Sequence, residues 1–356
     1  MKKTKRVMFF LIVIIALFWG YKGIKRLMYV YDKRAYHRVM EDTAKWDANR
    51  PNPIDFSESN FSNSGIENIA LVTMVKDEED IIYENLVWHF CIGFRKFVIV
   101  DNNSTDKTLS LIHKFKKETE GKAIVIIMED PIFEHIQSRI ITASTRIVNS
   151  VWPEVEWVFP VDADEFWYPN RALDKILADV PRDKDAILVA PYVQRPCVKR
   201  DKIDFSKRFY DVLCCQDKNI GQELGKVAIR SSFDVIVMQG NHHAMFANSK
   251  YLPQKVSGNI LGLYMLHFHI RSVDQVYKKF WNGARANIAL KKKEGSYTGK
   301  NEGHWDAFVD EVQDKGALKA AIDRFDGYVA DEGATIDDTI EFEKAKSFYD
   351  KIIGEK

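Results

Sequence analysis

The feature that most constrains the fold is an alternation, between residues 69 and 161, of short β-branched runs with stretches of helical spacing. Four runs have the character of strands: 69–74, 96–100, 123–128 and 157–161. Three stretches with apolar residues at helical spacing lie between these runs. The first is 78–90, the second begins in the polar cluster 102–106 and continues through Phe115, and the third is at about 138–150. Strands and helices in this order form a largely parallel sheet covered by helices. The pattern predicts an α/β fold, with Ser104 or Thr105 as the N-cap of the second helix.

Polar side chains follow three of these predicted strands, at 76–78, 101–106 and 162–165. Open α/β sheets bind ligands at the carboxyl ends of their strands, so we expect these groups to converge at one edge. The arrangement resembles a mononucleotide-binding half. We expect ligand contacts from this set: Lys76, Asp77, Glu78, Asp101, Asn103, Asp106 and Asp162. Asp101 is suited to accept a hydrogen bond from a base or ribose, and the alternative is a structural Asx-turn.

Asp162 and Asp164 form a D-x-D at the end of the fourth strand. Two carboxylates one residue apart can face one hard cation, such as Mg²⁺ or Mn²⁺, that leaves positions for phosphate oxygens. A second D-x-D, Asp183 and Asp185, follows Pro181 and is surrounded by charge, which indicates a solvated turn. The apolar strand before the first copy favours the metal, against a turn or N-cap role.

The first 45 residues carry 11 Lys and Arg against 3 Asp and Glu, although the whole 356-residue chain has a net charge of only +1. This basic excess flanks 13 consecutive apolar residues, Val7 to Trp19. The remaining chain is mildly acidic and has no basic stripe for nucleic acid. We expect a membrane anchor at 1–23, followed by a juxtamembrane helix and linker at 24–65. A cleaved signal peptide or an interfacial helix is the alternative.

The charges on either side of the apolar run, together with two N-glycosylation patterns, indicate on which side of the membrane the catalytic region lies. The positive flank after the apolar run favours a catalytic region on the cytoplasmic side of a bacterial inner membrane. Acceptor patterns start at Asn102 and Asn103, where a glycan would block the expected site, and this also favours the cytoplasm. A lumenal, Golgi-type orientation stays open.

The four cysteines have no spacing typical of zinc sites or disulfide scaffolds, so we expect buried thiols.

Three segments together carry a family resemblance: ALVTMVKDEEDIIYENLVWH, VIVDNNSTDKT and WVFPVDADEFWYP. They resemble the first strand, the nucleotide loop and the D-x-D strand of family 2-like glycosyltransferases with the GT-A fold. Asp77 stands where that family usually has Asn. Farther on, GNHH at 240–243 and HFHIRSVDQ at 267–275 resemble a bacterial branch that shows G-N-H and H-F-P-I-R-S, and His269 replaces its Pro.

The resemblance implies a GT-A catalytic domain at 66–270, a mixed sheet flanked by helices, followed by a helical extension at 271–356. It implies a hexosyl or related sugar transferase that uses a nucleotide-diphosphate sugar, with UDP-sugar expected, and Mn²⁺ or Mg²⁺. The acceptor would be a glycan or a lipid-linked molecule. Asp162 and Asp164 would hold the metal, with His267 as a further ligand or a core histidine.

Other candidates follow from residue chemistry. Arg271 can bind a diphosphate through its planar fork, or lie at a helix start as a surface charge. His242 is a possible site residue because Gly240 and Asn241 precede it. The general base of an inverting transfer is open among three carboxylates: Glu165, Glu223 and Asp234. The aromatic run 166–168 would either stack on sugars or pack in the core.

Two other functions stay open at this point. A sugar nucleotidyltransferase has a similar sheet and metal need, but ordinarily a Gly-rich loop after the first strand, which 75–80 lacks. A non-catalytic carbohydrate-binding membrane protein could share the fold, because a fold does not determine function.

Overall fold

The computed structural model describes residues 60–132, 137–196, 213–215, 225–246, 253–297, 305–329 and 342–354. The predicted anchor at 1–23 and most of the predicted linker at 24–65 lie outside these ranges. No helix within them combines the length and the apolar character that a membrane crossing requires. Almost all described residues belong to the predicted catalytic region and the C-terminal extension.

A seven-stranded mixed sheet lies at the centre of the molecule, in the order β12-β6-β9-β4-β1-β2-β3. Its strands are β1 (Ile69–Val75), β2 (Lys96–Asp101), β3 (Ile124–Glu129), β4 (Trp157–Pro160), β6 (Ala186–Val189), β9 (Lys226–Arg230) and β12 (Lys255–Ser257). Strands β1 to β4 are mutually parallel, and β9 is antiparallel to both of its neighbours. The predicted α/β class with four parallel strands is confirmed.

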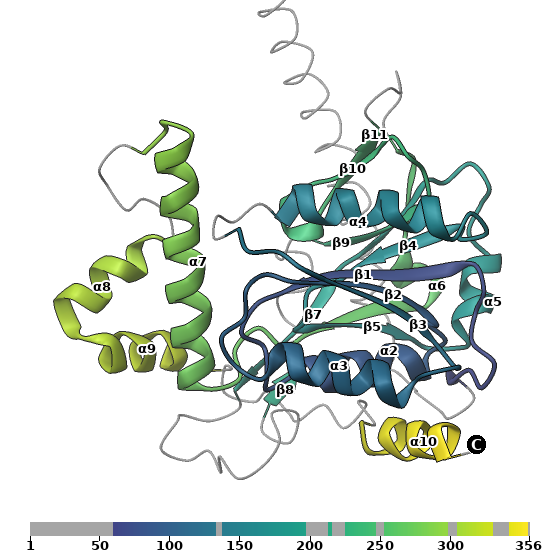
Figure 1. The fold of residues 1–356 in the computed structure, drawn as a ribbon, viewed down its shortest axis with the longest axis horizontal. Coiled ribbons are helices and arrows are strands. Elements are labelled where there is room, and N and C mark those ends of the chain that lie inside the picture. The colour runs from purple at the N-terminus through teal and green to yellow at the C-terminus, as the bar shows by residue number, and fades with distance from the viewer. Residues whose placement is uncertain are drawn as a thin grey trace, which may run out of the picture.

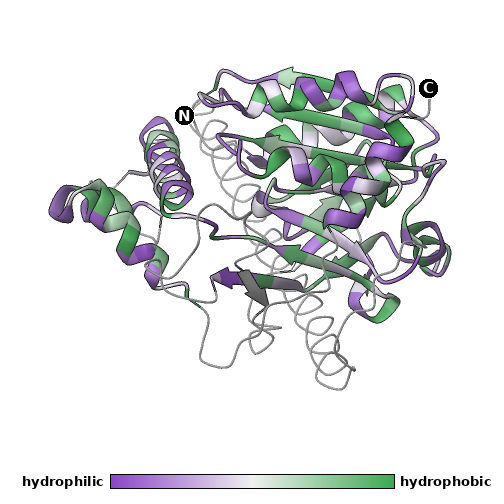
Figure 2. Cartoon of the chain, turned by 90° about the horizontal axis from the view of Figure 1, so that it is seen from below, coloured by the Kyte–Doolittle hydropathy of each residue, from purple (hydrophilic) through white to green (hydrophobic). Residues whose placement is uncertain are grey.

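Helices cover both faces of this sheet (Figure 1): α2 (Ile82–Cys91) and α3 (Thr108–Glu118) on one, and α4 (Gln137–Val151) on the other. Helix α10 (Phe342–Gly354) packs against α2. Successive side chains of a strand point to opposite faces. Ile69 and Leu71 therefore pack with α2 and α3, whereas Ala70 and Val72 pack with α4. The strands are mostly apolar along their length and the helices alternate between apolar and polar residues (Figure 2).

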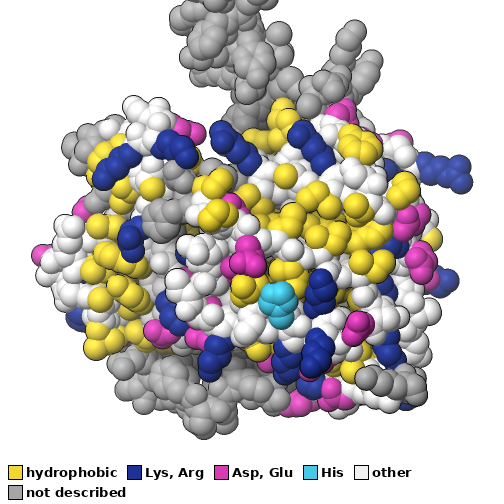
Figure 3. Space-filling model, viewed as in Figure 1, with side chains coloured by type: hydrophobic (Ala, Val, Ile, Leu, Met, Phe, Trp, Pro, Cys, Tyr) yellow, Lys and Arg dark blue, Asp and Glu magenta, His cyan; other side chains and the backbone are white. Residues whose placement is uncertain are grey.

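Strand β3 is an edge of the sheet and is less covered than its neighbours. The side chain of Ile124 is 54% exposed. The face of the molecule shown in Figure 3 carries apolar side chains among the charged ones.

Two predicted helix starts are wrong, and local hydrogen bonds explain both. Helix α2 begins at Ile82, because the N–H groups of Ile81 and Ile82 donate to the Glu78 carbonyl and close a turn over 78–81. Helix α3 begins at Thr108, and neither predicted residue caps it. Asp106 Oδ1 accepts from the Thr108 N–H at 2.9 Å instead.

A second sheet, β5-β13-β7-β8, packs beside the first. It consists of β5 (Glu165–Pro169), β7 (Pro191–Pro196), β8 (Leu213–Cys215) and β13 (Leu263–His267). Phe166, Trp167 and Tyr168 of β5 are fully buried. Tyr168 stacks on Trp88 of α2, with ring centroids 5.5 Å apart. These aromatic residues therefore pack in the core and are not available to a sugar.

The C-terminal extension divides into two parts. Helices α7 (Val273–Lys293), α8 (Ala307–Lys315) and α9 (Ala317–Asp326) share a separate apolar cluster and stand to the side of the sheet (Figure 1). Helix α10 belongs to the main core, where Phe342 packs on Trp88 and Tyr349 on Phe90. The short elements that complete the fold are α5 (Leu173–Ala178), β10 (Val235–Val237), η5 (Gln239–Asn241), β11 (Ala244–Phe246) and α6 (Gly258–Leu261).

His89 of α2 is a buried, neutral histidine, and this makes stability depend on pH. Its Nε2 accepts the Trp167 N–H at 3.3 Å, and its Nδ1 lies 2.8 Å from the Asn85 carbonyl, so the ring proton is on Nδ1. Burial lowers the pKa of His89 from 6.5 to about 3. Between these values the unfolded chain binds a proton that the folded chain does not. Stability that is present above pH 6.5 is therefore lost as the pH falls toward 3.

We expect His89→Gln to remove this component, which is about 1 kcal/mol per pH unit. Urea unfolding between pH 7 and pH 5 measures it, as the change in unfolding free energy with pH. His113→Gln is the matched control, because His113 lies exposed on α3. Equal pH slopes for wild type and His89→Gln would contradict the assignment.

Candidate functional site

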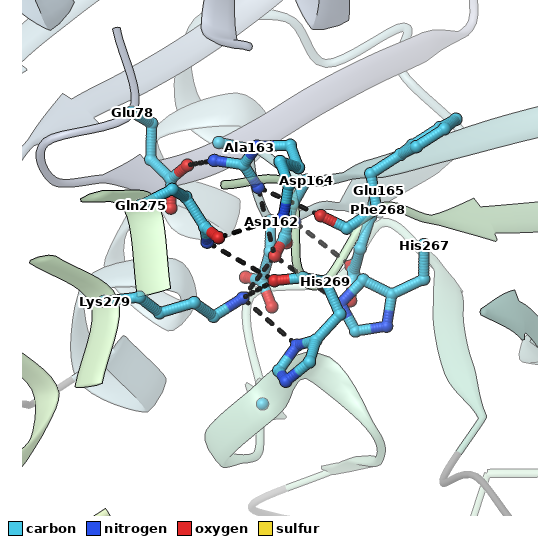
Figure 4. Close-up of polar contacts among 12 residues, drawn as sticks. Glu78, Asp162, Ala163, Asp164, Glu165, His267, Phe268, His269, Gln275 and Lys279 are labelled. Atoms are coloured by element: carbon cyan, nitrogen blue, oxygen red, sulfur yellow. Dashed lines mark hydrogen bonds and ion pairs between the residues drawn. The ribbon is translucent and has the colours of Figure 1, made fainter. Parts of the chain in front are cut away.

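Polar side chains from distant parts of the chain meet at the carboxyl ends of β1, β4 and β13. The residues that meet there are Glu78, Asp80, Gln137, Asp162, Asp164, Glu165, Lys226, Asn241, His267, His269, Arg271 and Lys279. Figure 4 shows most of this cluster. The predicted convergence at one edge of the sheet is therefore observed for the ends of β1 and β4.

The D-x-D lies in a tight turn between β4 and β5. The Glu165 N–H donates to the Asp162 carbonyl at 3.0 Å, and the Asp162 N–H donates back to Glu165 Oε2 at 3.1 Å. Glu165 is fully buried and pairs with Lys226 at 2.5 Å. Burial raises the pKa of Glu165, and the Lys226 ammonium opposes that rise. Glu165 thus holds the turn in shape, and its role as the general base stays a prediction.

Asp162 and Asp164 bond to different groups. Asp162 Oδ1 accepts from Gln137 at 2.6 Å and from Asn241 at 3.0 Å, and its Oδ2 lies 3.2 Å from Lys226 Nζ. Asp164 faces β13 and α7 instead. Strand β4 ends at Pro160, so both aspartates lie in the turn beyond it, and joint coordination of one cation by the two carboxylates stays a prediction. In a turn, residues i and i+2 need not share a face.

Asp164 lies within reach of two histidines and a lysine. One ligand atom from each of Asp164, His267 and His269 lies within 4.8 Å of the others. His267 Nε2 is 3.6 Å from Asp164 Oδ2, and Lys279 Nζ contacts the same oxygen (Figure 4). Burial alone would raise the pKa of Asp164, but Lys279, His267 and Arg271 outweigh it and hold this pKa well below its usual value.

This set of ligand atoms fits a divalent cation. A carboxylate oxygen and two imidazole nitrogens suit Mn²⁺ and similar borderline ions better than Mg²⁺, which prefers oxygen alone. The ion pairs of the cluster join five carboxylates (Glu78, Asp80, Asp162, Asp164, Glu165) to three cations (Lys226, Arg271, Lys279). Burial raises the pKa of Glu78 and of Glu165 to about 7, so these two carboxyls carry only part of their charge near neutral pH.

Arg271 is buried and ties loops together. Its guanidinium donates to Asp80 at 2.8 and 2.9 Å, to Glu78 at 2.5 Å and to the Phe268 carbonyl at 3.0 Å. Four of its five N–H groups are therefore used, and the remaining one faces Asp164 at 3.9 Å. Arg271 thus fixes loops, and its burial excludes the surface-charge alternative, whereas its contact with a diphosphate stays a prediction.

The loops after β1 and β2 are joined by side chains that we predicted as ligand contacts. Asp77 Oδ1 accepts from the Thr105 N–H at 2.7 Å, and Asp106 Oδ2 accepts from the Glu79 N–H at 3.3 Å. Lys76 Nζ donates to the Asn103 carbonyl at 2.7 Å. Their role in the structure is to hold the two loops in register.

Asp101 ends β2 and has an unused acceptor. Its Oδ2 accepts from the Ser104 N–H at 3.0 Å, which is the predicted Asx-type bond. Its Oδ1 is buried and has no hydrogen-bond partner in the part of the chain that the structure describes. A buried acceptor without a partner costs free energy, so it is suited to a donor group of a ligand.

The other predicted residues are placed as follows. His242 Nδ1 lies 3.0 Å from the Gly225 carbonyl, and burial lowers the pKa of His242 to about 4. Asp234 lies at the opposite edge of the sheet, since Arg230 before it pairs with Trp157 at the start of β4. Glu223 lies outside the described residues. Asp183 is exposed in a turn, as predicted for the second D-x-D.

Six residues of the cluster were not predicted: Asp80, Gln137, Lys226, Asn241, His269 and Lys279. The G-N-H motif does contribute, but through Asn241. Gly240 has φ +75°, and a Cβ there would lie 2.6 Å from the His242 ring, so the motif requires glycine at this position. His269 could have been found because it lies two residues from His267. Lys226 and Lys279 carry no local signal.

No family model and no curated protein matches the sequence. Among solved structures, a mannosyltransferase from Pyrobaculum calidifontis in complex with GDP-Man and Mn²⁺ matches with 14% identity, 78% coverage of each chain and a TM-score of 0.36. S. aureus TarS residues 1–349 in complex with UDP-GlcNAc match with 11% identity, 80% and 89% coverage and a TM-score of 0.34. The same TarS segment with UDP has a TM-score of 0.32. At these TM-scores the matches establish neither fold nor function for this chain.

Lys226 is the cation that makes the burial of Glu165 tolerable. We expect Lys226→Met to destabilise the protein by about 3 kcal/mol, because it leaves buried carboxylates without their partner. The double variant Lys226→Met with Glu165→Gln removes both charges and should recover part of the loss. Urea unfolding at pH 7.5 measures both, and a single variant within 1 kcal/mol of wild type, a threshold of about the size of a surface pair, would exclude this role.

Proposed function

We propose that this protein is a metal-dependent glycosyltransferase of the GT-A type that moves a sugar from a nucleotide-diphosphate donor to a glycan or lipid-linked acceptor. The observation that carries the proposal is the group Asp164, His267 and His269 where the ends of β4 and β13 meet, with ligand atoms within 4.8 Å of one another. A family resemblance in the order of the motifs points in the same direction.

We assign the following roles to residues of the chain. Asp164, His267 and His269 would hold the metal, which when bound neutralises charge on the departing diphosphate. Asp162 is held by Gln137, Asn241 and Lys226 and keeps a part-exposed side chain beside this group. Asp101 Oδ1 would accept a hydrogen bond from the base or the ribose. The paired loops after β1 and β2 would keep that acceptor in place.

The alternatives differ in chemistry that can be measured. A sugar nucleotidyltransferase would need a phosphate-binding loop after β1, and residues 76–81 contain no glycine. A non-catalytic carbohydrate-binding protein would not turn over a donor. Release of nucleoside diphosphate from a panel of nucleotide sugars, with Mn²⁺ and with or without acceptor glycans, distinguishes the proposed transferase from the binding protein. Silence across the whole panel would favour the binding protein.

Asp164→Asn should abolish metal-dependent binding of a nucleoside diphosphate. We expect UDP or GDP with Mn²⁺ to raise the melting temperature of the wild-type chain by about 5 °C at 100 times Kd, since ligand binding stabilises the folded state. Asp164→Asn should lose this shift while remaining folded. The measurement is thermal unfolding of the full chain in detergent.

The second D-x-D provides a matched control for this experiment. Asp183→Asn changes the same residue type in an exposed turn, so the shift should persist. Asp101→Asn should weaken nucleotide binding but leave binding of Mn²⁺ alone unchanged. An unaltered shift in Asp164→Asn would count against the metal assignment.

The proposal includes attachment to a membrane through the apolar run at 7–19, with the catalytic region on the cytoplasmic side. We expect the full chain to sediment with membranes and a variant lacking residues 1–23 to remain in the supernatant. Protease added to sealed right-side-out vesicles should leave the catalytic region intact. Recovery of the full chain in the supernatant would exclude the anchor, and digestion in sealed vesicles would reverse the orientation.

A further inference from the structure

Lys279 occupies the position toward which the candidate metal ligands converge. It lies on the second turn of α7, and its ammonium contacts Asp164 Oδ2. The same nitrogen is 3.2 Å from His269 Nδ1 and 3.4 Å from the His269 carbonyl. Figure 4 shows this ammonium between the carboxylate and the imidazole ring.

The ammonium uses the lone pairs that a metal would need. A lysine ammonium has donors only, so His269 Nδ1 must be the acceptor, and the ring proton is on Nε2. Burial and the nearby Lys279 charge hold the pKa of His269 well below its usual value, in agreement with a neutral ring. Nδ1 is then the only nitrogen of His269 with a free lone pair. A metal ion and the Lys279 ammonium cannot share that lone pair, and two cations at the same Asp164 oxygen would repel each other.

The surroundings allow Lys279 to leave without disturbing the ligands. The Gln275 side chain donates to the His269 carbonyl at 3.3 Å and accepts from the Arg271 N–H at 3.2 Å, which fixes the segment 269–271. Helix α7 is anchored by Val276 and Phe280, both buried. The flexible four-carbon stem of lysine can therefore move while the backbone and both histidines stay in place.

We propose that Lys279 is a resident counter-ion that a divalent metal must displace, and that the displaced ammonium then pairs with the diphosphate of the nucleotide. This inference rests on the proposed function. Without a diphosphate, metal binding breaks the Lys279–Asp164 pair, and the nearby Glu78 carboxyl is already paired with Arg271. With a diphosphate the ammonium gains a new anionic partner. Metal and nucleotide therefore bind cooperatively, and Lys279 is the residue that couples them.

The distinguishing prediction is that removal of a site residue improves binding. Lys279→Met should raise the affinity of the full chain for Mn²⁺ alone by about tenfold, because no ion pair has to be broken. It should also reduce the factor by which UDP increases Mn²⁺ affinity. Loss of the free Mn²⁺ signal in electron paramagnetic resonance measures binding without reference to activity. Lys279→Gln keeps a donor toward Asp164, so its Mn²⁺ affinity should lie between those of wild type and Lys279→Met. This variant also serves as the test if the methionine variant unfolds.

Lys278→Met is the matched control. The neighbouring Lys278 pairs with Glu79 at 3.4 Å and with Asp274 at 3.0 Å, and it makes no contact with Asp164 in the described structure. Lys278→Met should leave the Mn²⁺ affinity, and the factor by which UDP increases it, within about twofold of the wild-type values.

Two contrary results have different meanings. If wild type binds Mn²⁺ and Asp164→Asn does not, but Lys279→Met binds it no more tightly than wild type, the counter-ion role is excluded and the proposed function stands. If neither wild type nor any Lys279 variant binds Mn²⁺, with or without UDP, the counter-ion role and the proposed metal dependence both fail.

Discussion

The structure of this site depends on how carboxylates that have little contact with water are paired. Glu165 and Asp164 lie in a turn at the end of a buried strand, where isolated charges would be very costly. Lys226 neutralises Glu165 from β9, and Lys279 and Arg271 surround Asp164 from the segment after β13. These pairs connect elements that are far apart in sequence. The geometry of the D-x-D turn therefore depends on distant cations as much as on the strand that leads to it.

Arg271 has the widest reach in this network. It bonds the turn after β1 through Glu78 and Asp80, and the start of the α7 segment through the Phe268 carbonyl. It thereby links the α7–α9 unit, which has its own apolar cluster, to the central sheet. Lys279 and Asn282 reach the loops from that unit, so its docking determines the charge around Asp164. A catalytic role for the cluster would depend on this docking.

The cluster has features of both a structural and a functional site. A purely structural network would use its acceptors and would not need to gather metal ligands. Here one ligand atom from each of Asp164, His267 and His269 lies within 4.8 Å of the others, and Asp101 Oδ1 is buried without a partner in the described part of the chain. A nucleotide with a divalent ion supplies a cation for these ligands and a hydrogen-bond donor for that oxygen. That combination is the physical reason for preferring a transferase over a scaffold protein.

The four parallel strands, and the edge of the sheet that carries Asp162 and Asp164, could be predicted from local sequence. β-branched runs and helical spacing are local properties, and the carboxyl ends of parallel strands must lie together. Local sequence also distinguished the D-x-D that follows a buried strand from the copy at Asp183, which lies exposed in a turn. His267 was implied only by the family resemblance, because it lies on β13 of the second sheet. Tertiary contacts were needed to show that Asp162 and Asp164 take different partners, that Arg271 fixes loops, and that Lys279 lies among the ligand atoms. Those outcomes depend on long-range ion pairs whose strength comes from burial, and burial is a property of the folded chain that no local pattern encodes.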